Sequence, residues 1–198
     1  MIDIKIRMAR ETDTEEILGI YAPYIKDTVI TFEYEIPTLN EFKSRIRKIS
    51  ADYPYLVCTK DEKIVGYAYS HRHMERAAYQ WNVELSVYID NSYLHCGMGK
   101  ALYSALIEIS KLQNIQNIYG GVTSPNKNSE KLHEYFSFKK LGVYHNTGYK
   151  FGKWHDVIWF EKNISEYYGE PKQLLLIKDI DEEVLDEIMA KCCKMIKI

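Results

Sequence analysis

The sequence predicts an α/β (α+β) domain built on a mixed central sheet. Segments in which apolar and polar residues alternate, which indicate strands, interleave along the chain with segments of helical periodicity. The expected order is β-α-α-β-β-β-α-β-α-β-β, which is typical of layered folds with helices packed on a sheet. The chain has 198 residues, 46% of them apolar and 27% charged, and this suits a single globular domain.

Two Thr-x-x-Glu patterns mark helix starts in the N-terminal third. In such a capping box the hydroxyl and the carboxylate satisfy free amides at the start of a helix. Thr12 with Glu15 therefore predicts one helix start, and Thr38 with Glu41 predicts a second. Strands are expected around these helices at residues 3–8, 55–60 and 64–70, the last two forming a hairpin.

Residues 79–89 carry the clearest strand pattern of the chain. Apolar residues from Tyr79 to Ile89 alternate with polar ones, so this strand has one apolar and one polar face. Glu84 lies in the middle of the polar face. If another layer covers that face, the carboxylate needs a partner. Glu84 is thus a candidate functional residue, although a lone acidic residue is more often structural.

A Gly-Met-Gly-Lys sequence at residues 97–100 links this strand to a predicted helix. Glycines allow tight backbone geometry, and the free amides and dipole at a helix start attract phosphate groups. The pattern lacks the third glycine of a dinucleotide fingerprint, and Ala101 after Lys100 excludes a nucleotide P-loop. The residues leave two interpretations open, a phosphate site and an ordinary tight turn.

The rest of the domain is predicted from similar patterns. A strand at 117–123, a helix at 129–136 and strands at 138–149 and 154–161 are expected. His133 lies in that helix, where a lone histidine is more often structural than catalytic. From residue 165 the character changes, and residues 181–197 have helical periodicity. We therefore expect a domain at 1–164 and a C-terminal extension at 165–198, either packed on its own subunit or serving as a dimer arm.

Composition excludes several classes of protein. A formal charge of −2 argues against a dedicated nucleic-acid binder. The four cysteines show no Cys-x-x-Cys spacing, so we expect free thiols in a reducing compartment and no metal site. Charges recur every few residues at the N-terminus, and no stretch approaches ~18 uncharged apolar residues. These features predict a cytoplasmic protein that does not span a membrane.

Several short blocks, spread over residues 3–163, carry a family resemblance when they are taken together. They include Thr31-Phe32-Glu33, Arg76-Ala77-Ala78-Tyr79-Gln80-Trp81 with Val83-Glu84, Gly97-Met98-Gly99, Pro125-Asn126 with Leu132-His133-Glu134, and Gly148-Tyr149-Lys150 with Trp154. With these blocks in unbroken order, the chain resembles the GNAT superfamily of acetyl-CoA-dependent N-acetyltransferases. Within that superfamily it resembles the phosphinothricin and methionine sulfoximine acetyltransferases. The tail after about residue 165 lies outside the resemblance.

The resemblance implies a GNAT fold, a mixed twisted sheet whose two central strands splay apart to admit acetyl-CoA. The pantetheine would run beside the strand at 85–87, and the pyrophosphate would bind amides of the loop at 94–99. The residues expected to contact the cofactor are Leu85, Ser86, Val87, Leu94, His95, Cys96, Gly97, Met98, Gly99, Lys100, Asn126 and Ser129. The family loop usually begins with Arg or Gln and then often Gly. Leu94 and His95 occupy these positions here, so we expect weaker cofactor binding.

The resemblance also implies direct transfer of the acetyl group to the amine of a small amino acid or an analogue. Glu84 matches the general base of the family, and His133 is assigned as the general acid. Arg76 is a candidate clamp for a carboxylate or phosphinate, because its planar guanidinium binds such groups bidentately. Phe32, Tyr79 and Trp154 are expected to wall the acceptor site, and the resemblance suggests a homodimer.

Two alternatives remain open from the sequence. The enzyme could acetylate another amine, such as an aminoglycoside, a polyamine or a protein N-terminus. A strongly acidic site would favour those cations, whereas an arginine-lined site favours amino acids. The chain could also be a non-catalytic CoA-binding module, an idea motivated by Leu94, His95 and the added tail. The presence of both Glu84 and His133 speaks against that module.

Overall fold

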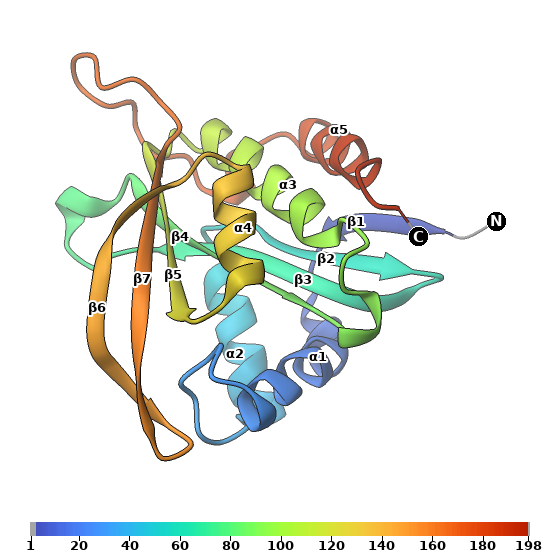
Figure 1. The fold of residues 1–198 in the computed structure, drawn as a ribbon. Coiled ribbons are helices and arrows are strands. Elements are labelled where there is room, and N and C mark those ends of the chain that lie inside the picture. Colours follow the sequence, from blue (N-terminus) through green and yellow to red (C-terminus); the bar gives the residue numbers. More distant parts are fainter. Residues whose placement is uncertain (1–2, 198) are drawn as a thin grey trace.

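The computed structural model describes residues 3–197, which form a seven-stranded sheet with helices on both faces (Figure 1). The strands are β1 (Ile4–Met8), β2 (Tyr55–Lys60), β3 (Lys63–Arg72), β4 (Asn82–Ile89), β5 (Asn117–Ser124), β6 (Lys139–Lys150) and β7 (Lys153–Asn163). The helices are α1 (Thr14–Asp27), α2 (Leu39–Ser50), α3 (Met98–Leu112), α4 (Lys127–Tyr135) and α5 (Glu182–Cys193). The predicted order of strands and helices is confirmed.

The sheet has the strand order β1-β2-β3-β4-β5-β7-β6. Its described strands pair antiparallel except at the centre, where β4 and β5 are parallel and pair only over Asn82–Glu84 and Asn117–Tyr119. On its other edge β4 stays paired with β3 as far as Ile89. The two central strands therefore separate after Glu84, as the predicted splayed sheet requires.

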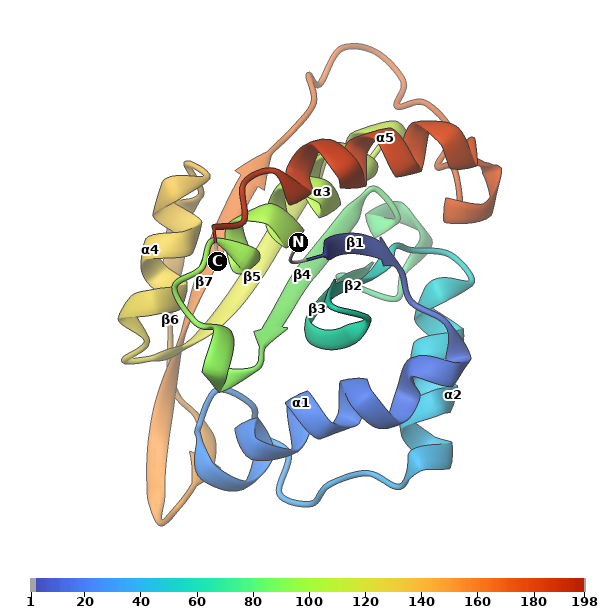
Figure 2. The same cartoon turned by 90° about the vertical axis from the view of Figure 1, so that its right-hand side faces the viewer.

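Each face of the sheet carries its own hydrophobic cluster. Val83 and Leu85 of β4 pack with α3 residues such as Leu102 in the larger cluster. On the opposite face, the cluster between the sheet and helices α1 and α2 includes Ile17 and Phe42. Figure 2 shows α1 and α2 on one side of the sheet and α3 and α5 on the other. The alternation in β4 thus directs neighbouring side chains into different layers.

Only one of the two predicted capping boxes forms. The Thr38 hydroxyl accepts the Glu41 amide hydrogen, and the Glu41 carboxylate accepts the Thr38 amide hydrogen at 2.8 Å. The predicted Thr12–Glu15 box is wrong, because α1 begins at Thr14 with Asp13 as its N-cap. The Asp13 carboxylate instead accepts hydrogens from the Arg7 guanidinium and the Arg10 amide, each at 2.7 Å.

The predicted start of the central strand is also wrong, by three residues. Ala77–Tyr79 form a short 3-10 turn, and β4 begins at Asn82. In that turn the Tyr79 amide donates to the Arg76 carbonyl at 2.9 Å, and a backbone bonded this way cannot join the sheet ladder. The alternation of apolar residues thus extends back to Tyr79, although local hydrogen bonds hold that residue in a turn.

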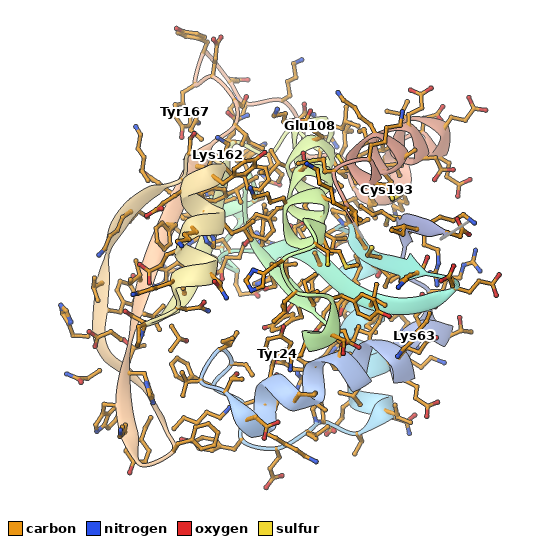
Figure 3. The ribbon with its side chains drawn as sticks, turned by 45° about the vertical axis from the view of Figure 1, so that its right-hand side comes forward. Tyr24, Lys63, Glu108, Lys162, Tyr167 and Cys193 are labelled. Atoms are coloured by element: carbon orange, nitrogen blue, oxygen red, sulfur yellow. The ribbon has the colours of Figure 1, made fainter. Side chains whose placement is uncertain are left out.

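The C-terminal extension packs on its own chain. Leu185, Met189 and Cys192 of α5 are buried in the cluster that also covers α3. Cys193, labelled in Figure 3, donates its thiol hydrogen to the Ile4 carbonyl of β1 at 3.3 Å. Helix α5 thus contacts the domain of its own chain through these buried side chains. Within residues 3–197, no helix combines the length and apolar character needed to cross a membrane.

Candidate active site

The separation of β4 from β5 leaves backbone groups unpaired in the middle of the sheet. Beyond Glu84, the β4 residues Leu85, Ser86 and Val87 are paired with β3 but not with β5. An extended ligand can bond to such a strand edge as another strand would. The far end of β4 is anchored by Tyr24 of α1 (Figure 3), whose hydroxyl donates to the Ile89 carbonyl at 2.6 Å.

Glu84 lies at the point of separation, on the sheet face opposite Val83 and Leu85. Its side chain is 22% exposed, so the carboxylate is half-buried but within reach of a bound molecule. Its Oε1 atom is 2.7 Å from Nδ1 of His73. Its Oε2 atom is 4.0 Å from Nε2 of His71, which is too long for a hydrogen bond. The carboxylate is therefore held by one oxygen and open at the other.

His73 is fixed in place by two aromatic side chains. Its ring stacks on Tyr119 of β5 with centroids 4.3 Å apart, and Trp159 of β7 meets it edge-on at 5.7 Å. The His73 amide donates to the Asn82 carbonyl at 3.1 Å, which extends the β3–β4 ladder beyond β3. Glu84, His73 and Tyr119 thus come from three neighbouring segments of the sheet and meet on one face.

His133 of α4 is buried, with an exposed fraction of 2%. Its ring stacks on Phe160 at 4.8 Å and lies so close to Gly120 that a methyl group there would be 2.3 Å from Nε2. Nδ1 is 2.8 Å from the Ser129 carbonyl, which can only accept, so Nδ1 carries a hydrogen. Nε2 lies 3.4 Å from the Tyr103 hydroxyl, which is also 3.4 Å from the Leu85 carbonyl.

The burial of His133 predicts a loss of stability in weak acid. Burial lowers the pKa of its imidazole below the ordinary 6.5, and the bond to Ser129 offsets only part of this. Below pH 6.5 the unfolded chain consequently binds more protons than the folded one, so the free energy of unfolding decreases as pH falls. Urea unfolding at several pH values should show a shallower decrease for His133→Gln; an unchanged slope would contradict this origin.

The loop before α3 has the backbone of a tight turn at the start of a helix. His95 and Gly97 adopt positive φ angles of 65° and 84°, and Gly97 is the N-cap of α3. The first amides of α3, from Met98 onward, lack helical partners and can bond an anion. The position where the family often has glycine is thus left-handed here although it holds His95. Lys100 lies over the Tyr135 ring at 3.6 Å.

The C-terminal tail touches this loop. The Lys197 amide donates to the Cys96 carbonyl at 2.9 Å. The Met195 carbonyl lies against Gly97, where a side chain would come within 2.7 Å of it. Farther along, Asn126 caps α4 by accepting the Ser129 amide hydrogen at 3.1 Å. The predicted cofactor residues therefore occupy the open edge of β4 and the N-termini of α3 and α4.

The four predicted acceptor residues lie in two separate regions. Phe32 packs on Gly148 and His155, and Trp154 packs on Tyr149, so both lie on the hairpin of β6 and β7. Trp154 is 61% exposed. Arg76 and Tyr79 are exposed in the connection between β3 and β4. The structure thus brings Phe32 and Trp154 to one hairpin and leaves Arg76 and Tyr79 on another loop.

The segment that carries Phe32 is tied to β6 by a buried lysine. Lys150 is 2% exposed, and its ammonium group donates to the carbonyls of Ile25 and Thr31 at 2.7 and 2.8 Å. The Tyr34 hydroxyl also donates to the Tyr149 carbonyl. These bonds fix the connection between α1 and α2 against the far end of the β6–β7 hairpin.

The sequence interpretation missed His73 and its neighbour His71, of which only His73 lies within hydrogen-bond distance of Glu84. His71 lies near the end of β3, and His73 is the first residue after that strand. Their spacing of two residues places both on the face that holds Glu84. The available signal was two histidines at this spacing just after the strand predicted at 64–70. Their contact with Glu84 depends on the register His71 to Glu84, which local patterns do not reveal.

The fold and the family match define an acetyltransferase. The family described as the Acetyltransferase (GNAT) domain matches residues 6–159, and the chain belongs to this family. The predicted GNAT fold, family and enzyme class are thereby confirmed.

Named relatives are similar along almost their whole length. Phosphinothricin N-acetyltransferase of Streptomyces coelicolor is 32% identical over an alignment of 164 residues, which covers 81% of this chain and 96% of the relative. L-methionine sulfoximine/L-methionine sulfone acetyltransferase of Salmonella typhimurium is 26% identical, over 82% of this chain and 95% of the relative. The crystal structure of a GNAT superfamily phosphinothricin acetyltransferase from Sinorhizobium meliloti in complex with AcCoA has a TM-score of 0.83 and 27% identity, covering 89% of this chain and 96% of that one.

Proposed function

We propose that this protein transfers the acetyl group of acetyl-CoA to the amine of a small amino acid or an analogue of the phosphinothricin or methionine sulfoximine type. The observation that carries the proposal is the end of β4–β5 pairing at Glu84, where an open strand edge and a half-buried carboxylate meet. The names of the relatives supply the acceptor class. Acetyl-CoA is the co-substrate of this enzyme.

The chemistry begins with a proton, because an ammonium ion has no free electron pair. Glu84 takes a proton from the acceptor, directly or through a water molecule, and the electron pair stays on nitrogen. The nitrogen attacks the thioester carbon, the carbonyl oxygen gains charge, and the backbone amide near Leu85 or Ser86 stabilises it. The C–S bond then breaks with its electron pair on sulfur, and the nitrogen gives its second proton to water as the product amide forms.

The leaving thiolate needs a proton, and we assign His133 as its general acid. The ring lies beside Gly120, the first β5 residue after the pairing with β4 ends. Burial lowers the pKa of this imidazole and so disfavours the doubly protonated ring that a general acid needs. We therefore expect loss of His133 to lower kcat less than loss of Glu84.

The acceptor site is proposed to include Arg76 as the clamp for a carboxylate or phosphinate, with Phe32, Tyr79 and Trp154 as its walls. Arg76 and Tyr79 come from the connection between β3 and Glu84's own strand. We further propose that the enzyme is a cytoplasmic homodimer. Its four free cysteines agree with a reducing compartment, and analytical ultracentrifugation measures the assembly.

A thiol-release assay across acceptor amines tests the function. Purified protein with acetyl-CoA should release CoA in the presence of phosphinothricin, methionine sulfoximine or a related amino acid, and mass spectrometry should find the N-acetyl product. An aminoglycoside, a polyamine and a peptide with a free N-terminus serve as comparison acceptors. CoA release with those comparison amines alone would contradict an amino acid as the acceptor. A lack of release with every one of these amines would contradict the proposed acetyltransferase activity.

The departure at the start of the phosphate loop predicts a gain of affinity on substitution. Leu94 is 40% exposed and offers no charge to a pyrophosphate. Leu94→Arg adds a guanidinium that can bond phosphate oxygens, so the Kd for acetyl-CoA should fall by roughly 3–10-fold at low salt. Calorimetric titration measures this, with Leu94→Ala as the control. Equal affinities of the wild type and Leu94→Arg for acetyl-CoA would mean that its phosphates bind away from residue 94.

A further inference from the structure

We propose that His73 is a positioning residue for the base: it holds Oε1 of Glu84 so that Oε2 is the atom that takes the proton from the acceptor amine. The role in proton transfer rests on the proposed function. The contact itself rests on geometry alone, because His73 Nδ1 and Glu84 Oε1 are 2.7 Å apart.

The direction of this hydrogen bond follows from the two groups. An ionised carboxylate can only accept, so the hydrogen of the short contact belongs to Nδ1 of His73. A charge-assisted bond of this kind is stronger than a bond between neutral groups, and it limits rotation of the carboxylate about its terminal torsion. One oxygen of Glu84 is therefore occupied by a donor that the fold supplies.

The second oxygen of Glu84, Oε2, receives no hydrogen bond from its other neighbour, His71. His71 Nδ1 lies 3.0 Å from the Arg72 carbonyl, so Nδ1 carries the hydrogen of a neutral His71 ring. Its Nε2 atom then has no hydrogen to give and lies 4.0 Å from Oε2. His73 therefore bonds Oε1 of Glu84, whereas Oε2 remains available to a bound acceptor.

The surroundings of His73 make it a rigid support. Its side chain is 13% exposed, less than the 22% of Glu84, so His73 is the more buried member of the pair. Tyr119 and Trp159 fix the ring plane from β5 and β7. In the proposed step the N–H bond of the ammonium breaks, an O–H bond forms at Oε2, and the bond from His73 to Oε1 persists.

Two substitutions of His73 test its hydrogen-bond donor independently of its stacking ring. His73→Phe keeps an aromatic ring to stack on Tyr119 but removes the donor, and we expect kcat to fall roughly 10–100-fold with little change in KM for acetyl-CoA. His73→Asn keeps an N–H near the position of Nδ1 and should retain most of the activity. His71→Phe is the matched control on the same face, and it should change kcat by less than about threefold.

A double-variant cycle distinguishes positioning from a structural role. If His73 acts through Glu84, adding His73→Phe to Glu84→Gln should cause almost no further loss of kcat. An equal loss in both backgrounds would overturn the proposal, as would wild-type kcat for His73→Phe or a parallel loss of acetyl-CoA affinity.

Nitrogen NMR of labelled protein gives a readout that needs no turnover. We expect His73 Nδ1 to carry a hydrogen in the wild type, and substitution Glu84→Met should shift its resonance. An active wild type in which Nδ1 of His73 carries no hydrogen overturns this inference alone. A wild type without turnover on any amine overturns the proposed function and, with it, the role of His73 in proton transfer.

Discussion

Glu84→Gln is expected to lower kcat by roughly 10²–10⁴-fold, the usual contribution of a positioned general base. The amide keeps the size of the carboxylate and can still accept the hydrogen from His73, so the geometry at Oε1 should persist. What disappears is the atom able to take a proton from the ammonium group. Because Glu84 takes no part in binding the phosphates, the Kd for acetyl-CoA should stay within about twofold.

Thiol-release kinetics measure kcat, and calorimetric titration measures the Kd for acetyl-CoA. Glu108→Gln is the matched control, since Glu108 lies on the exposed side of α3 (Figure 3), where it pairs with Lys111 at 2.7 Å. That variant should keep wild-type kcat. Turnover by Glu84→Gln at the wild-type rate would remove the base from the mechanism.

Gly120→Ala is expected to destabilise the protein by about 1–3 kcal/mol, the usual cost of overpacking a filled core. The added methyl group would lie 2.3 Å from Nε2 of His133. That ring cannot move aside easily, because Phe160 stacks on it and Phe138 meets it edge-on at 5.0 Å. The clash should therefore displace α4 or β5, next to the point where the central strands separate.

Thermal unfolding measures the loss of stability in Gly120→Ala. In a chain of this size, each kcal/mol lost should lower the Tm by ~2–4 °C. Gly142→Ala is the matched control, because no atom of residues 3–197 lies within 4 Å of the methyl group it would add on β6. Its Tm should equal or slightly exceed the wild-type value. A Gly120→Ala protein as stable as Gly142→Ala would mean that His133 is not packed on β5 as the structure has it.

The parts of the fold that the sequence predicts well are those set by local patterns. Alternation along β4 placed Glu84 on the face opposite Val83 and Leu85, and the Thr38–Glu41 box marked the start of α2. The Thr12–Glu15 box failed because a residue between them, Asp13, is taken by Arg7 of the preceding strand. Local pattern and tertiary contact competed there, and the half-buried ion pair decided the helix start.

The parts of the site that the sequence does not predict depend on register and packing. The contact between His73 and Glu84 arises only once β3 and β4 pair with His71 opposite Glu84. The packing of His133 on Gly120 joins a helix to a strand across the core. The tail contact of Met195 with Gly97 likewise joins residues 98 positions apart in the sequence, so no short-range spacing could indicate it.

A crystal structure with CoA and an acceptor amino acid bound tests the proposed site most directly. We expect the pantetheine to bond the β4 edge at Leu85–Val87, the pyrophosphate to lie on the first amides of α3, and the acceptor nitrogen to face Oε2 of Glu84. Coenzyme A bound away from the opening between β4 and β5, or an acceptor nitrogen on the α3 side of the sheet away from Glu84, would contradict the proposed reaction.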